Sequence, residues 1–152
     1  MSKVFLSLHV IAAILAIGPV AVAASMFPPA LRKAKEDPAS LPALRNLNRI
    51  CQVYAGIGIA VPLFGFITAS TMNVLGDGWL IVSIVLTAFA AAVLALLILP
   101  RQAAALALVN GDAAADVGAS AARLAMFTGV FNLLWTVVTV LMIVRPGSST
   151  GA

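Results

Sequence analysis

The chain has 152 residues, of which 62% are hydrophobic and only 9% are charged. Soluble domains carry about 25% charged residues because their surface faces water, so this composition excludes a soluble globular domain. The net charge of +4 comes without a long basic run, which argues against nucleic-acid binding. The single Cys51 excludes an intramolecular disulfide and any zinc cluster built on cysteines.

Four uncharged stretches predict four membrane spans, in chain order at residues 4–27, 50–76, 79–100 and 124–144. A helix of about 20 residues crosses a hydrocarbon core of ~30 Å, and each stretch reaches that length. The apolar runs are continuous and lack a period of two, which argues against strands. We therefore predict an all-α fold: an antiparallel bundle of four transmembrane helices in one domain at 1–145, with a disordered tail at 146–152.

The first span has a competing interpretation as a secretory signal peptide. Lys3, the apolar run and the small residues up to Ala23 resemble such a peptide with its cleavage site. However, a signal peptide keeps its positive end in the cytoplasm, whereas here the basic cluster follows the apolar segment. His9 would also interrupt the apolar region. The first span is therefore expected to remain part of the protein.

The connections differ in length and charge. In the first, Pro38 and Pro42 predict short helical pieces with turns between them, lying at headgroup level. The second is short, and Gly76 and Gly78 are expected to permit the reversal. In the third, the sequence Asn-Gly-Asp at 110–112 separates two alanine-rich helical pieces. Two acidic residues of this third connection, Asp112 and Asp116, are expected to form only a solvated face.

The basic residues predict the orientation. Only Lys3 and Arg145 belong to the side that holds the termini. Seven basic residues belong to the other side: Arg32, Lys33, Lys35, Arg45, Arg49, Arg101 and Arg123. The positive-inside rule places the side with seven in the cytoplasm and both termini outside. Trp79 is then expected at the outer interface and Tyr54 at the inner one.

The basic first connection predicts contact with lipid headgroups. Five residues would bind anionic lipids such as cardiolipin: Arg32, Lys33, Lys35, Arg45 and Arg49. The alternative, that these charges only fix the topology, remains open, and both can hold.

His9 is the only residue within a predicted span that titrates near neutral pH. An ionisable group inside a span is a functional hypothesis because its burial costs free energy. Thr68, Ser83 and Thr139 are expected at a similar depth. His9 would bond one of these hydroxyls or a backbone carbonyl and hold helices together. The alternatives are a haem or metal ligand, or a proton-transfer group.

The fourth span carries a polar face. Thr128, Asn132 and Thr136 recur at i, i+4 and i+8, with Thr139 following. These side chains are expected to make interhelical contacts. The alternative is that they line a polar path, although such a path normally brings charges into the spans.

Small residues recur at helix-packing intervals in the second and third spans. Gly56 and Ala60, then Gly65 and Ala69, follow a small-xxx-small spacing in the second span. In the third span, a stripe is formed by Ser83, Thr87, Ala91 and Ala95. Gly58 and Pro62 also predict a kink in the second span.

The opening LHVIAAILAIGPV at 8–20 resembles the first span of the DUF2269 family of small bacterial membrane proteins. It is more distantly similar to the copper-resistance membrane family and its haem-pathway relatives. In that pattern an early histidine precedes small residues and a W-x-G element. His9 and Gly18 stand at the matching positions, while the tryptophan and the further histidines of the copper- and haem-linked families are missing here. The composition and architecture also resemble accessory subunits attached to the actinobacterial cytochrome bcc–aa3 oxidase.

The sequence lacks the G-x-S-x-G, Walker and H-E-x-x-H signatures, so we expect no enzyme and no cofactor. The main hypothesis is an accessory subunit that docks on other integral membrane subunits, as in a respiratory oxidase. One alternative is a haem- or metal-binding redox protein that uses His9. Another is a small transporter or channel lined by Thr128, Asn132 and Thr136.

Overall fold

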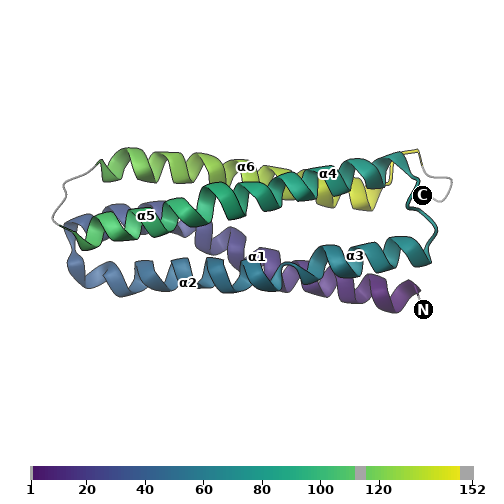
Figure 1. The fold of residues 1–152 in the computed structure, drawn as a ribbon, viewed down its shortest axis with the longest axis horizontal. Coiled ribbons are helices and arrows are strands. Elements are labelled where there is room, and N and C mark those ends of the chain that lie inside the picture. Colours follow the sequence, from purple (N-terminus) through teal and green to yellow (C-terminus); the bar gives the residue numbers. More distant parts are fainter. Residues whose placement is uncertain (1, 112–115, 148–152) are drawn as a thin grey trace.

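The computed structural model describes residues 2–111 and 116–147, and the elements in this part of the chain are helical (Figure 1). Four long apolar helical stretches lie side by side, each long enough to cross a bilayer. The predicted all-α bundle of four spans is therefore confirmed. The elements are α1 (Ser2–Glu36), the 3-10 turn η1 (Pro38–Ser40), α2 (Leu41–Ile57), α3 (Ala60–Thr71), α4 (Gly78–Ala92), the π-helical turn η2 (Val93–Ile98), α5 (Leu99–Asn110) and α6 (Val117–Val144).

The first connection is shorter than predicted because the basic residues lie within helices. At 35 residues, α1 is about 52 Å long, roughly 20 Å more than a bilayer core requires. Arg32, Lys33 and Lys35 occupy its last turns, and α2 resumes at Leu41. The helix ends just before Pro38, because the proline ring makes the α-helical conformation unfavourable for the residue that precedes it. Asp37 is accordingly extended, and its carboxylate accepts a hydrogen bond from the Ala39 amide at 3.0 Å.

Two irregularities interrupt the second and third spans. The α-helix is interrupted where the kink was predicted, since α2 ends at Ile57 and α3 begins at Ala60. Pro62 has no N–H to donate to the Gly58 carbonyl, which instead accepts from the Val61 amide at 3.1 Å. The π turn Val93–Ile98 was not predicted. It lies just before Pro100, whose ring would clash with the preceding helical turn, so the backbone widens there.

The reversal between α3 and α4 uses a different residue from the predicted glycines. Asn73 adopts the left-handed conformation with φ 55°, whereas Gly76 and Gly78 do not have positive φ. Asparagine tolerates this region because its side chain is short and polar. Gly78 is instead the first residue of α4.

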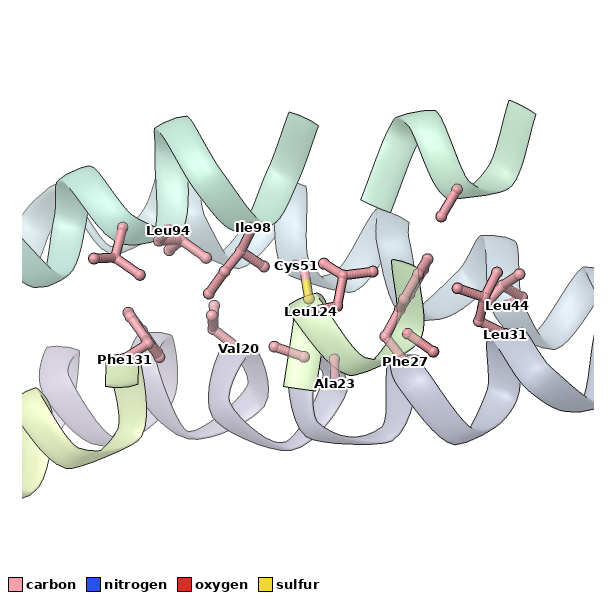
Figure 2. Close-up of a cluster of buried hydrophobic side chains, with 14 of the residues drawn as sticks. Val20, Ala23, Phe27, Leu31, Leu44, Cys51, Leu94, Ile98, Leu124 and Phe131 are labelled. Carbon is pink, nitrogen blue, oxygen red and sulfur yellow. The ribbon is translucent and has the colours of Figure 1, made fainter. Parts of the chain in front are cut away.

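The main core lies in the half of the bundle that carries the basic residues (Figure 2). Side chains of α1, α2, α5, α6 and the π turn contribute to this cluster, in which Phe27 is fully buried. Other members of the cluster include Val20, Leu31, Leu44, Cys51, Ile98, Leu124 and Phe131. Ala23, at the cleavage position of the signal-peptide alternative, also lies in this core.

In the opposite half the helices pack mainly as two pairs, α1 with α3 and α4 with α6. A second, small cluster forms where α3 meets α4, around Ala69, Trp79 and Leu80. The Trp79 indole donates to Asp77 at 3.0 Å, and the Arg145 guanidinium lies 5.6 Å from the ring centroid. Trp79 thus joins the start of α4 to the end of α6, while its place at the outer membrane interface stays a prediction.

The third connection contains Asp112 and Asp116, the two acidic residues predicted to form only a solvated face. Asp116 caps α6, because its carboxylate accepts from the Ala119 amide at 3.0 Å. Asp112 and the predicted disordered residues 148–152 lie outside the described residues, and Pro146 and Gly147 form a turn after α6.

Candidate functional site

His9 links α1 to α3 through a backbone carbonyl. Its Nδ1 lies 2.9 Å from the Val61 oxygen, and the side chain is half-buried. Since a carbonyl only accepts, the Nδ1–H is the donor, and in the neutral ring the lone pair then sits on Nε2.

Gly65 allows this contact. A Cβ built at Gly65 would lie 2.8 Å from His9 Cε1 and 3.0 Å from Nδ1, closer than side chains approach. The ring therefore packs directly on the α3 backbone, as the small-residue spacing in this span suggested. By contrast, Gly56 has no neighbouring atom within 4 Å of such a Cβ, so it is not a close-approach position.

The hydroxyls proposed as partners for His9 bond within their own helices instead. Each donates to the carbonyl four residues earlier: Thr68 to Phe64, Ser83 to Trp79, and Thr139 to Trp135, at 2.7–2.8 Å. This differs from the interhelical contacts predicted for them. A local carbonyl is always within reach of a helical Ser or Thr, whereas a partner on another helix must be positioned.

The polar face of α6 makes one interhelical hydrogen bond. Asn132 Nδ2 donates to Ser25 Oγ on α1 at 3.1 Å, and Ser25 itself donates to the Ala21 carbonyl. Thr136 bonds its own helix, at the Asn132 carbonyl. Among the described residues, three buried side-chain atoms of α6 have no partner: Thr128 Oγ1, Asn132 Oδ1 and Trp135 Nε1.

A buried polar layer was missed by the sequence interpretation. Asn48 Nδ2 donates to Gln102 Oε1 at 3.1 Å, and Gln102 Nε2 donates to Cys51 Sγ at 3.5 Å. This layer joins α2 to α5, and all three side chains are buried. Leu44, Asn48 and Cys51 recur at i, i+4 and i+7, a helical spacing that could have placed Asn48 on the inner face.

The basic residues gather where α1 ends and α2 begins, at the same end of the bundle as the end of α5 and the start of α6 (Figure 1). The basic residues of α1 and α2 at this end are all exposed: Arg32, Lys33, Lys35, Arg45 and Arg49. Arg123 on α6 is exposed as well. Arg45 Nη2 donates to Asn110 Oδ1 on α5 at 2.9 Å. Arg101, half-buried, stacks 4.5 Å from the Phe127 ring centroid.

Comparison with known families agrees with this architecture. A family profile described as "Predicted integral membrane protein (DUF2269)" matches residues 3–146. The chain belongs to this family. No curated protein and no solved structure matches the chain, so the DUF2269 assignment establishes an integral membrane protein and leaves its role to be argued from the structure.

The remaining site predictions for this DUF2269 protein concern small residues and metals. In the third span Ser83 is buried, but Ala90 rather than Ala91 faces the bundle, and Ala95 is exposed. A strict spacing of four drifts off one face because the helix has 3.6 residues per turn. Within residues 2–111 and 116–147, no group of three or more His, Cys, Asp or Glu could hold a metal ion.

Proposed function

We propose that this DUF2269 protein is a non-catalytic accessory subunit that packs against other integral membrane subunits, as in a respiratory oxidase. The observation that supports this most is how the polar side chains in the spans are used. His9 bonds the Val61 carbonyl and Asn132 bonds Ser25, so both hold helices of this chain together. Polar groups engaged in packing favour a role carried by the outer surfaces of the bundle.

The lateral surface supports docking within a membrane. Large apolar side chains point outward along the spans, for example Ile14, Phe89 and Ile143. Such a surface is compatible with lipid and with the apolar flank of another membrane subunit. Helices associate in membranes through close packing and hydrogen bonds, not through a hydrophobic driving force.

The basic end supports a second contact, with anionic lipids such as cardiolipin. Each exposed Lys or Arg near an anionic surface contributes about 1 kcal/mol, and Arg32, Lys33 and Lys35 follow one another within two turns of α1. The cytoplasmic leaflet carries anionic lipid. We accordingly propose that this end is cytoplasmic and that both termini lie outside, in the plasma membrane.

Gentle extraction tests the docking proposal. The tagged protein, solubilised in a mild detergent, is expected to co-migrate with at least one other integral membrane protein at a fixed ratio, measured by native electrophoresis and mass spectrometry. The control is the same preparation after a harsh detergent, which should release the chain. A chain that runs alone in every mild detergent contradicts the proposal.

A second candidate function is haem binding through His9. The Nδ1–H bond to the Val61 carbonyl resembles the way a ligating histidine is oriented by its other ring nitrogen, and it directs the lone pair to Nε2. His9 Nε2 would be the atom that holds the iron of a haem. The absorbance spectrum of the same preparation decides between the two candidates. A Soret band that is present in the wild-type protein and disappears in His9→Ala favours haem binding. A wild-type spectrum without a Soret band excludes it.

A further inference from the structure

The outer face of α2 carries a shallow groove with a volume of about 200 Å³. Its lining residues are Asn46, Arg49, Ile50, Val53 and Tyr54. The inner face of the same helix is defined by the buried Leu44, Asn48 and Cys51. At 100° per residue, Asn46 and Val53 lie on the side opposite these three residues. The groove therefore faces away from the bundle, where lipid surrounds the protein.

The lining changes from polar to apolar along the helix. Asn46 and Arg49 come just before the uncharged stretch that begins at Ile50. Ile50 and Val53 form the apolar part, and the half-buried Tyr54 lies one turn beyond Ile50. This order matches the boundary between headgroups and acyl chains, where tyrosine and arginine are enriched at membrane interfaces.

We propose that this groove binds one anionic phospholipid through its phosphate diester, an inference that rests on the lipid-binding part of the proposed function. The Arg49 guanidinium pairs with the phosphate, since its fork of donors matches phosphate oxygens. The Asn46 amide, on the water side of Arg49, donates to oxygens of the headgroup, and the Tyr54 hydroxyl, on the membrane side, donates to the ester oxygens. The first methylenes of one acyl chain lie along Ile50 and Val53.

Charge selects an anionic headgroup over a zwitterionic one. Arg45 lies one turn before Arg49 on α2, and its hydrogen-bond partner, the Asn110 amide, is neutral and does not offset its charge. Two guanidinium groups within one turn attract a headgroup of net negative charge. They repel the ammonium of a zwitterionic headgroup, which lies close to its phosphate.

Native mass spectrometry of the full-length protein tests the site with phosphatidylglycerol as the probe and phosphatidylcholine as the comparison lipid. Arg49→Gln is expected to weaken phosphatidylglycerol binding about fivefold, the equivalent of about 1 kcal/mol for one interfacial charge. Arg49→Lys keeps the charge and should retain most of the binding. The matched control Arg123→Gln removes an equal charge from the same end of the bundle, at an exposed position of α6 outside the groove, and should leave binding unchanged. Equal losses in Arg49→Gln and Arg123→Gln would overturn the proposal in favour of a diffuse electrostatic attraction.

A groove-filling variant tests the shape independently of the charge. Val53 is half exposed, so Val53→Trp occupies the groove without entering the core, and thermal stability should stay unchanged. Loss of phosphatidylglycerol binding in this variant supports the site, and wild-type binding contradicts it. If Val53→Trp lowers thermal stability, its loss of lipid binding has another cause, and the Arg49 variants alone then test the site. If a partner subunit co-purifies but phosphatidylglycerol does not bind, only this inference is overturned. If phosphatidylglycerol binds but no partner subunit co-purifies, only the docking proposal is overturned.

Discussion

Gly65→Ala is expected to destabilise the bundle by about 2 kcal/mol, an effect of overpacking. In most helices this substitution stabilises, because glycine costs up to about 1 kcal/mol of backbone entropy relative to alanine. Here the added methyl would lie 2.8 Å from His9 Cε1. The ring must move, and the hydrogen bond to the Val61 carbonyl is lost with it. The free energy of unfolding, measured by SDS titration in mixed micelles, checks the sign and the size.

A double-mutant cycle separates the clash from any general effect on α3. In a His9→Ala background the ring is absent, so Gly65→Ala should become neutral or stabilising, giving a coupling of more than about 1 kcal/mol. Gly56→Ala is the matched control, since open space surrounds that position. Equal destabilisation by Gly65→Ala with and without His9 would show that the two residues are not in contact.

Phe27→Ala is expected to be the most destabilising single substitution in the core, by about 3 kcal/mol or more. The ring is 0% exposed and lies in the main core cluster, to which α1, α2 and α6 contribute side chains (Figure 2). Removing it leaves a cavity that the rigid helices fill only in part, so packing contacts are lost. The midpoint of thermal denaturation in detergent, or the same SDS titration, measures the loss.

Phe66→Ala provides the control for size and hydrophobicity. Phe66 is 60% exposed on α3, where lipid or detergent replaces its contacts, so the expected change is below about 1 kcal/mol. Similar losses for Phe27 and Phe66 would contradict the assignment of the core to the basic half of the bundle.

The spans could be predicted from the sequence, whereas their full lengths could not. An uncharged run marks where a helix meets hydrocarbon, but it does not mark where the helix ends. Arg32, Lys33 and Lys35 continue α1 because lysine and arginine favour helices in water as well. The break near Gly58 was predictable because Pro62 removes a backbone donor. The π-helical turn before Pro100 could not be predicted, because a proline within a helix is compatible either with a kink or with a π-helical turn.

The contacts of the candidate site were predictable only in part. A histidine within a span requires a hydrogen-bond partner, but the depth of a residue does not identify which helix lies beside it. His9 meets α3 at Val61 because Gly65 opens that surface, a pairwise fit that neither segment reveals alone. Asn48 was missed because it lies outside the uncharged run, although its spacing from Leu44 and Cys51 is helical.

The two halves of the bundle differ in the size of their buried core and in the role proposed for each. The basic half holds the large core and the layer formed by Asn48, Gln102 and Cys51. The other half consists mainly of two helix pairs, tied by His9 on one side and by Trp79 and Arg145 on the other. The half with the larger core carries the proposed lipid site, and the half with the smaller cluster has apolar flanks. This division suits the proposed subunit, which would bind lipid at one end and pack along its sides.

Cysteine accessibility tests the membrane placement of these two ends most directly. Ala39 lies in the turn at the basic end and Leu75 in the turn between α3 and α4, both exposed, while the native Cys51 is buried. In intact cells a membrane-impermeant maleimide should label Leu75→Cys and not Ala39→Cys, which should react only after permeabilisation. Labelling of Ala39→Cys in intact cells would contradict the proposed orientation, and protection of both sites after permeabilisation would contradict the placement of these turns in water.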